Sequence, residues 1–405
     1  VNFIANHTPL QAPNADIAAY AGRYTAGWTA LRNQRRAAVI AKGMMPAGVA
    51  MVTMNTSGDW SKLSPQERQQ RAGAMAAYAG MATAMDREIG RLVAHLKAIG
   101  EYENSIFVFL SDNGAEATDP MAMGAFARWN ATHLYDQSIA QQGRPGSLTA
   151  QGAGFASASV SPLRGYKFTA SEGGLRVPMI MAWPGNPAIR GGRVATGFAH
   201  VTDMPPTLLA LAGVTAQQGV FAGRRVEPMI GLNLSPMLTG STPSVHPADK
   251  PLGYELSGNA VLFKGDYKLV KNLPPYGDAR WRLYNISADP GETDNLSRAD
   301  PERFAVMQSD YVAFARANQV LPMPEGYTAP DQIFANALRT LLIPRLLELW
   351  PAGAILVIAL ATLIRWRRRR ATRRGCSPST RSSCRRRAAA RSPTATEARR
   401  RDDDF

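Results

Sequence analysis

Cysteine is almost absent from this 405-residue chain. Its two cysteines, Cys376 and Cys384, both lie close to the C-terminus. The rest of the chain therefore forms no disulfide bond and offers no thiol for catalysis or metal binding. Cysteine usage consequently gives no indication of the cellular compartment of the globular part.

Acidic residues are scarce at the C-terminal end, which makes the chain as a whole look more basic than most of it is. Residues 365–405 contain 15 arginines and four acids, a net charge of +11 within a total of +15. The first 364 residues therefore carry only +4. A net charge of +4 gives no reason to expect that these residues bind nucleic acid. Residues 367–405 show no hydrophobic period, so we expect them to form a basic disordered tail.

Long hydrophobic runs are also rare, with one exception at residues 346–364, where Glu348 is the single charge and Pro351 interrupts the run. About 20 apolar residues span a bilayer, so we expect a transmembrane helix within residues 338–366, with a core helix as the alternative. The arginines of 365-RWRRRR-370 would hold the C-terminus in the cytoplasm. The preceding part of a membrane-anchored chain would then lie outside the cytoplasm; a cytoplasmic protein is the alternative.

What the sequence does contain is an alternation of amphipathic helix and apolar strand. Ser64-Pro65-Gln66-Glu67 has the composition of a helix start, and residues 71–100 repeat apolar residues at helical spacing. The run 105-SIFVFLSD-112 is typical of a central parallel strand covered on both faces. Residues 1–6 and 176–185 are expected to be further buried strands. Helix followed by buried strand indicates an α/β architecture.

The sequence after residue 250 changes character. Residues 260–263, 267–272 and 281–286 predict a small antiparallel sheet, and a helix is expected near residues 300–318. We therefore expect four regions along the chain. They are an α/β domain over residues 1–250, an antiparallel subdomain with its helix over 251–322, the transmembrane helix over 338–366 and the tail over 367–405.

Asp112 and Asn113 end the apolar run and precede Gly114. The simpler interpretation is a turn, because Asn-Gly favours turns without any further role. The alternative is a metal site. Ligands of open α/β sheets bind outside the carboxyl ends of the strands, and Asp and Asn oxygens suit Ca²⁺ or Mg²⁺.

Lys167 and His7 are the other polar residues at expected strand or loop ends. Lys167 lies in a glycine-rich loop, where it could hold an oxyanion, although a solvated lysine is the simpler interpretation. His7 follows the first expected strand and falls at the same expected edge as Asp112, although a structural role is the simpler interpretation. His200 precedes a helix start, so we expect it to serve packing and capping.

The order of the sequence blocks resembles that of the type I sulfatases, and of bacterial arylsulfatases in particular. The blocks are HTPLQAP at residues 7–13, MDREIGRL at 85–92, FLSDNGAE at 109–116, PLRGYKFTASEGGLRVPMIMAWPG at 162–185, HVTDMPPTLLALAG at 200–213, GDYKLV at 265–270 and WRLYNISADPGETDNL at 281–296. The resemblance covers about residues 1–320. It implies an alkaline-phosphatase-like fold, with a mixed sheet flanked by helices and a small C-terminal antiparallel sheet; residues 1–250 would be the C-terminal part of the catalytic domain.

The resemblance also implies roles for four residues. Asp112 and Asn113 match the second pair of ligands to an active-site Ca²⁺, Lys167 matches the lysine that binds the sulfate group, and His7 matches a histidine that contacts sulfate and assists the leaving group. A divalent cation together with Lys167 and His7 would neutralise the charge that develops on the sulfate oxygens. The implied activity is hydrolysis of a small-molecule sulfate ester to sulfate and an alcohol or phenol.

The nucleophile of these enzymes is a formylglycine, made from the Cys or Ser of a Cys/Ser-x-Pro-x-Arg motif that the sequence does not contain. A partial match, 376-CSPSTR-381, has its arginine one position too late. The expectation is therefore an N-terminally truncated sulfatase that is inactive by itself. Two alternatives remain open: a phosphomonoester or phosphonate hydrolase of the same superfamily, and an inactive membrane-anchored remnant.

Overall fold

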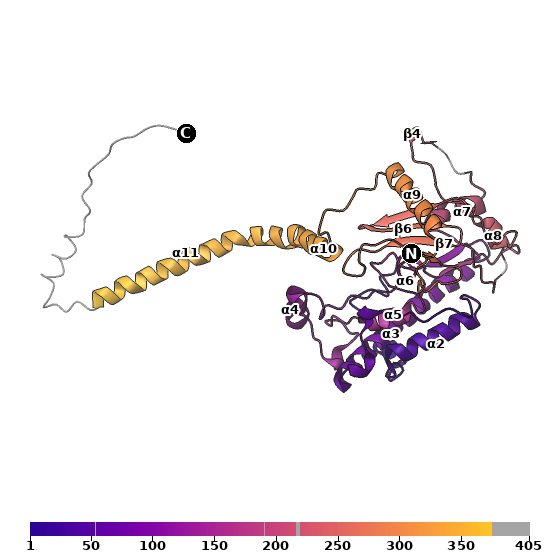
Figure 1. The fold of residues 1–405 in the computed structure, drawn as a ribbon. Helices are drawn as coiled ribbons and strands as arrows, with labels where there is room; N and C mark the ends of the chain where they lie inside the picture. The colour runs from indigo at the N-terminus through magenta and orange to yellow at the C-terminus, as the bar shows by residue number, and fades with distance from the viewer. Residues whose placement is uncertain (53, 190, 216–218, 375–405) are drawn as a thin grey trace, which may run out of the picture. The chain divides into compact units, whose positions relative to one another are not determined.

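A computed structural model describes residues 1–52, 54–189, 191–215 and 219–374. The chain divides into two compact units, Val1–Gly326 and Tyr327–Phe405 (Figure 1). The first unit combines helices with small antiparallel sheets, so the α/β class predicted from the sequence is confirmed.

Among its described residues, the first unit contains short helices, one long helix and three small sheets. In chain order its elements are α1 (Asn14–Ala18), α2 (Gly27–Ala41), the 3₁₀ turns η1 (Asn55–Ser57) and η2 (Trp60–Lys62), α3 (Pro65–Ala98), β1 (Phe107–Leu110), α4 (Ala125–Leu134), η3 (Ile139–Gln141), α5 (Gly152–Ser159), α6 (Glu172–Leu175), β2 (Met179–Ala182), η4 (Val201–Asp203), α7 (Met204–Leu211), β3 (Val220–Phe221), β4 (Arg224–Arg225), α8 (Ser235–Thr239), β5 (Leu252–Leu256), β6 (Asn259–Lys264), β7 (Tyr267–Lys271), β8 (Arg282–Asn285) and α9 (Pro301–Ala317).

The long helix α3 begins as the sequence predicts. The Ser64 side chain accepts a hydrogen bond from the Glu67 amide, and the Glu67 carboxylate accepts one from the Ser64 amide, which forms a capping box. The N-terminal half of α3 packs into an aromatic core through Met75, which lies against Trp28 of α2 and Phe155 of α5. The rings of Trp28 and Phe155 meet edge to face with their centroids 5.7 Å apart.

Strand β1 differs from its prediction in direction and in burial. Its partner in the described residues is β2, which runs antiparallel with Met179 opposite Leu110. The prediction of a parallel strand covered on both faces is therefore wrong, since Phe109 and Leu110 are each 39% exposed and Ile180 of β2 is 61% exposed. A continuous apolar run shows that a strand can be covered, but it does not encode the hydrogen-bond pattern that sets strand direction.

The predicted strand over residues 1–6 is also wrong. Val1 and Ile4 are 96% and 86% exposed, and a turn closes the segment through the His7 amide and the Ile4 carbonyl, 3.0 Å apart. A strand needs a neighbouring backbone to pair its N–H and C=O groups. The described part of the chain provides no such neighbour for this segment, so its apolar composition alone does not make it a strand.

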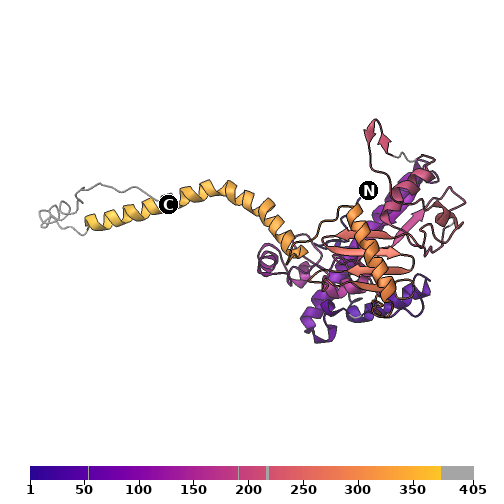
Figure 2. The same cartoon turned by 45° about the horizontal axis from the view of Figure 1, so that its top comes forward.

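Strands β5 to β8 form a four-stranded antiparallel meander, which confirms the predicted C-terminal sheet and adds β5, which was not predicted. Helix α9 confirms the predicted helix and lies across one face of this sheet (Figure 2). On that face Met307 of α9 packs against Leu262, Leu269 and Leu283. Alternation of side chains along each strand sends the next residues to the opposite face.

The opposite face of this sheet is covered by the segment around Ala170. The buried residues of that cluster include Val261, Val270 and Tyr284 from three neighbouring strands, and Ala170 packs among them. The four-stranded sheet is thus held between α9 and the block of residues 162–178.

The second unit is helical where it is described. It contains α10 (Ala329–Ala337), a π-helical turn (Leu338–Leu342) and α11 (Ile343–Arg374), with Pro351 inside α11. The continuous helix Ala329–Arg370 is long and apolar enough to cross a membrane by length and composition. Because α11 continues to Arg374, the first residues of the predicted tail are helical; residues 375–405, with the partial motif at 376–381, lie outside the described residues.

Candidate functional site

The segments that follow β1 and precede β2 pack backbone to backbone. The Gly114 amide donates to the Gly174 carbonyl over 2.9 Å, and the Lys167 amide donates to the Ala115 carbonyl over 3.1 Å. Gly114 is required by this approach, because a Cβ at that position would lie 1.8 Å from the carbonyl oxygen of Gly173. The two hydrogen bonds fix Lys167 beside Ala115 and Glu116, the last residues of the FLSDNGAE sequence block.

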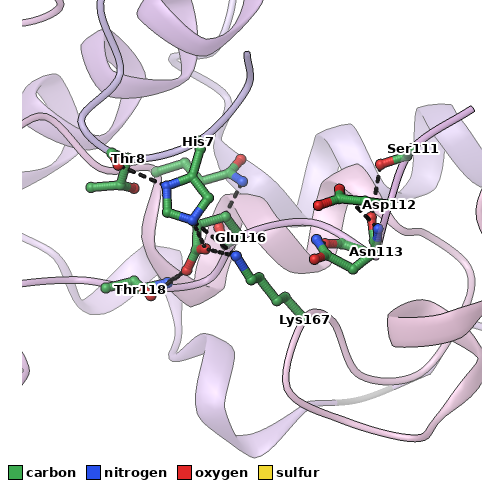
Figure 3. A network of polar contacts seen from close by, with 10 residues as sticks. His7, Thr8, Ser111, Asp112, Asn113, Glu116, Thr118 and Lys167 are labelled. Carbon is green, nitrogen blue, oxygen red and sulfur yellow. Dashed lines mark hydrogen bonds and ion pairs between the residues drawn. The ribbon is translucent and has the colours of Figure 1, made fainter. Parts of the chain in front are cut away.

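His7, Glu116 and Lys167 form one polar cluster (Figure 3). Lys167 Nζ lies 2.8 Å from Glu116 Oε2 and 2.9 Å from His7 Nε2. His7 Nε2 lies 3.0 Å from the same Glu116 oxygen. The structure therefore brings together His7 and Lys167, two of the predicted site residues, which are 160 positions apart in the sequence.

The hydrogen bonds of the cluster indicate which His7 nitrogen carries a proton. His7 Nδ1 lies 2.7 Å from the Thr8 carbonyl oxygen, which can only accept, so Nδ1 is the donor. In the neutral imidazole Nε2 is then an acceptor, and the Lys167 ammonium has enough protons to donate to both Nε2 and Glu116. Lys167 is therefore the shared donor between an imidazole and a carboxylate.

Glu116 is the buried member of the cluster, with a side chain that is 5% exposed, against 18% for Lys167 and 51% for His7. Burial by itself would raise the pKa of Glu116, but hydrogen bonds from Lys167 and from the hydroxyl and amide of Thr118 outweigh it and lower the pKa below its usual value. The buried side-chain amide of Gln151 donates to the backbone carbonyl of Glu116 over 2.8 Å and fixes the Glu116 backbone. Glu116 is therefore an anion held in one place.

Asp112 and Asn113 form a separate group in Figure 3. Asp112 Oδ1 accepts from the Asn113 amide over 3.0 Å, the Asn113 side chain donates to the Gly114 carbonyl over 3.0 Å, and the Ser111 hydroxyl donates to the Asn113 carbonyl over 2.8 Å. These are contacts of a local turn, which is the simpler interpretation of the sequence. Within the described residues, no hydrogen bond or ion pair joins Asp112 or Asn113 to the cluster of His7 and Lys167.

A calcium ion does not fit the residues that are present around Asp112. Ca²⁺ takes about six to eight oxygen ligands, and Asp112 and Asn113 supply two side chains. Among the residues that the structure describes, no group of three or more His, Cys, Asp or Glu residues could hold a metal ion. The predicted metal ligands therefore stay a prediction, as an incomplete pair.

Comparison with family models matches residues 1–214, more than half of the chain, to the family described as Sulfatase. The chain belongs to the sulfatase family. The matched region includes Asp112 and all three members of the His7–Glu116–Lys167 cluster.

Two curated sulfatases illustrate the likeness. The chain is 32% identical to an uncharacterized sulfatase of Schizosaccharomyces pombe over 81% of this chain and 59% of that protein. It is also 32% identical to an arylsulfatase of Klebsiella aerogenes, over 58% of this chain and 49% of that protein. This sulfatase-family chain thus spans about half to three-fifths of the length of these relatives.

Among solved structures, the chain matches Ps i-CgsB in complex with k-i-k-neocarrahexaose at 21% identity, with a TM-score of 0.48 over 84% of this chain and 53% of that one. It matches the phosphonate monoester hydrolase SpPMH from Silicibacter pomeroyi at 20% identity, with a TM-score of 0.43 over 78% of this chain and 55% of that one.

Glu116 is the member of the polar cluster in this sulfatase-family chain that the sequence interpretation missed. The available signal was a lone carboxylate shortly after Asp112, in a stretch of otherwise small residues. Nothing in that pattern shows that the carboxylate turns inward. A glutamate is buried only when a cation accompanies it, and its partners His7 and Lys167 come from distant parts of the chain.

His200 lies outside the cluster and serves capping, as predicted. Its ring nitrogen Nδ1 accepts from the Thr202 amide at the start of η4, and its own amide donates to Asp203 over 2.7 Å. Burial lowers the pKa of His200, with Asp203 opposing that shift and His246 adding to it. The imidazole is therefore a neutral acceptor in this cap.

Proposed function

We propose that this chain binds the sulfate group of a sulfate ester through Lys167 and His7, within the active site of a sulfate ester hydrolase. The observation that supports the proposal most strongly is the 2.9 Å approach of Lys167 Nζ to His7 Nε2 inside the region that matches the sulfatase family. A cation and an imidazole at one point suit an oxyanion better than a neutral ligand.

The residues of the cluster suit this chemistry. Hydrolysis breaks the bond between sulfur and the ester oxygen, adds a water oxygen to sulfur and returns a proton to the departing alcohol. The Lys167 ammonium would stabilise negative charge on the sulfate oxygens. His7 Nε2, which accepts a hydrogen bond from Lys167, would take up a proton that the attacking water releases and return it to the oxygen of the departing alcohol. Glu116 would hold the ammonium in place between turnovers.

The formylglycine and the calcium ion rest on the family resemblance and not on contacts among the residues of this chain. The sequence contains no Cys/Ser-x-Pro-x-Arg motif, and Asp112 and Asn113 supply only two ligands among the described residues. We therefore expect the chain by itself to bind sulfate without turning over sulfate esters. Release of 4-nitrophenol from 4-nitrophenyl sulfate by the purified chain would overturn that expectation.

Protection of Lys167 from acetylation tests the binding proposal. The full chain is treated with a trace of acetic anhydride at rising sulfate concentrations, and acetylation at each lysine is followed by mass spectrometry. Sulfate is expected to slow acetylation at Lys167 and to leave the exposed Lys250 unchanged; His7→Ala is expected to weaken the protection. Equal rates at Lys167 with and without sulfate would overturn the proposal.

A parallel titration with inorganic phosphate and methylphosphonate addresses the second candidate function. The phosphomonoester and phosphonate hydrolase alternative predicts that these ions protect Lys167 at lower concentrations than sulfate does. The sulfate ester proposal predicts the opposite order.

The substrate is proposed as a small-molecule sulfate ester, with no nucleic acid as partner.

The second unit is proposed to anchor the chain in a membrane. Helix Ala329–Arg370 has the length and composition for a single crossing, and Arg365 with Arg367–Arg370 stands at its C-terminal end. Such a cluster favours a cytoplasmic C-terminus, which would leave the His7–Glu116–Lys167 cluster on the other side of the membrane. Protease protection of the tail in sealed vesicles tests this orientation.

A further inference from the structure

A second cluster of charged side chains is buried next to the loop that carries Lys167. Lys268 of β7 is fully buried, and its Nζ lies 2.8 Å from Glu172 Oε1 and 2.9 Å from Glu292 Oε1. Glu172 follows Lys167 closely in the chain, in the block 162–178, whereas Glu292 belongs to the segment between β8 and α9. Lys268 therefore joins the C-terminal sheet to the block that carries Lys167.

The charges of this cluster balance. Arg176 Nε lies 2.9 Å from Glu172 Oε2, so two carboxylates are matched by two cations. Burial would lower the pKa of Lys268, but Glu172 and Glu292 outweigh it and raise the pKa, so Lys268 stays charged. Burial is also the largest influence on Glu292 and raises its pKa. Removing Lys268 would leave two buried carboxylates without their shared cation.

Asn272, directly after β7, makes the second link between the same two parts. Its Oδ1 accepts from the Ala170 amide over 2.6 Å, and its Nδ2 donates to the Ser171 hydroxyl over 3.1 Å. Every second side chain along a strand shares a face, so Lys268 and Asn272, four positions apart with Asn272 just beyond the end of β7, project to the same side of the sheet. Together they hold three consecutive residues, 170–172.

Hydrogen bonds within residues 164–173 connect the segment held by Lys268 and Asn272 to the loop that carries Lys167. The Thr169 hydroxyl and amide both donate to the Tyr166 carbonyl, over 2.8 and 3.1 Å. The Gly173 amide donates to the Arg164 carbonyl over 2.6 Å. A loop tied in this way moves as a unit, so displacement of residues 170–172 would carry Lys167 with it.

We propose that Lys268 and Asn272 are positioning residues for Lys167. Among the described residues, the C-terminal sheet contributes no side chain to the His7–Glu116–Lys167 cluster, yet it fixes the loop from which Lys167 reaches that cluster. The proposal rests on the proposed role of Lys167 in binding a sulfate group, and it gives the small sheet a function in that site.

Two variants test the proposal, with a third as control. Lys268→Met removes the buried cation, and Asn272→Ala removes only two neutral hydrogen bonds and covers the case in which Lys268→Met fails to fold. Lys264→Met is the matched control, because Lys264 lies on the adjacent strand β6 and pairs with Asp310 of α9 over 2.8 Å. That pair lies on the α9 side of the sheet, away from the Lys167 loop.

The first measurement is amide hydrogen exchange of the full chain without ligand. Lys268→Met and Asn272→Ala are expected to speed exchange in residues 164–174 while leaving the buried stretch of α3 as protected as in the unmodified chain. Lys264→Met is expected to leave both segments unchanged. Unchanged exchange in residues 164–174 in both test variants would overturn the proposal, and so would faster exchange spread evenly over the molecule.

The second measurement is the sulfate concentration that half-protects Lys167 from acetylation. A displaced ligand-binding group loses affinity steeply, so Lys268→Met and Asn272→Ala are expected to raise this concentration about tenfold. Faster exchange with unaltered sulfate protection would reduce the two residues to a purely structural role and overturn the proposal. If sulfate fails to protect Lys167 even in the unmodified chain, the proposed function fails, and the exchange experiment still decides whether the sheet fixes the loop.

Discussion

The amide of Gly114 lies 2.9 Å from the carbonyl oxygen of Gly174, and this hydrogen bond joins the segment after β1 to the segment before β2. The two backbones approach so closely that position 114 has no room for a side chain. Asn113 and Gly114 therefore form more than a surface turn: the glycine allows the contact that places Lys167 beside Glu116.

Gly114→Ala should destabilise the first unit. The added methyl group would meet the Gly173 carbonyl oxygen at 1.8 Å, and the backbone would have to move, at a cost of about 2–3 kcal/mol. The measurement is the free energy of unfolding in urea, with the chain in detergent. Gly90→Ala in α3 is the control; its methyl group would meet no atom within 4 Å, so it should be neutral or stabilising by about 0.5–1 kcal/mol. Equal effects of the two substitutions would contradict the close approach.

Acid should remove the contribution of Glu116 to stability. The pKa of Glu116 is lower in the folded protein than the ordinary value of 4.5, because its hydrogen bonds with Lys167 and Thr118 outweigh burial. The contribution is therefore complete above pH 4.5 and is lost as the pH falls through the folded pKa. Glu116→Gln should show a shallower loss of stability than the unmodified chain over this acid range.

Urea midpoints measured at a series of pH values supply the comparison for Glu116. Glu302→Gln, at an exposed position in the first turn of α9, serves as the control and should follow the unmodified chain. Identical pH profiles for the Glu116 variant and the unmodified chain would show that this carboxylate does not bind Lys167 in the way described.

Asp203→Asn should cost about 3 kcal/mol of folding free energy, because Asp203 is fully buried and its carboxylate binds three donors. Its oxygens lie 2.7 Å from the His200 amide, the Leu232 amide and His246 Nε2. Thermal unfolding measures the effect, and Asp249→Asn at an exposed position is the control. A loss for Asp203→Asn no greater than that for Asp249→Asn would contradict this arrangement.

A charge placed in the apolar part of α11 should weaken membrane association. Leu356→Arg introduces a cation near the middle of the candidate span, at a cost of about 2.5–3.5 kcal/mol for a membrane-inserted helix. The measurement is the fraction of the chain that resists extraction from membranes by alkaline carbonate. Val312→Arg, at an exposed position of α9, should leave that fraction unaltered. Full extraction of the unmodified chain would contradict membrane anchoring.

Prediction from the sequence succeeded where the signal is local. The capping box of Ser64 and Glu67 and the strands of the C-terminal meander depend on residues that are neighbours or nearly so along the chain. Prediction failed for the strand at residues 1–6 and for the direction of β1. Both depend on which backbone lies alongside, and a hydrophobic run does not specify that partner.

The sequence by itself determined the family resemblance and the α/β class, and it singled out His7 and Lys167 as candidate site residues. Only the tertiary structure decided that both side chains lie within 3.0 Å of the same Glu116 oxygen, and that Lys268 and Asn272 bind the segment next to the Lys167 loop. The physical reason is burial. A charged side chain leaves water only where an opposite charge meets it, and the fold decides which distant residues meet.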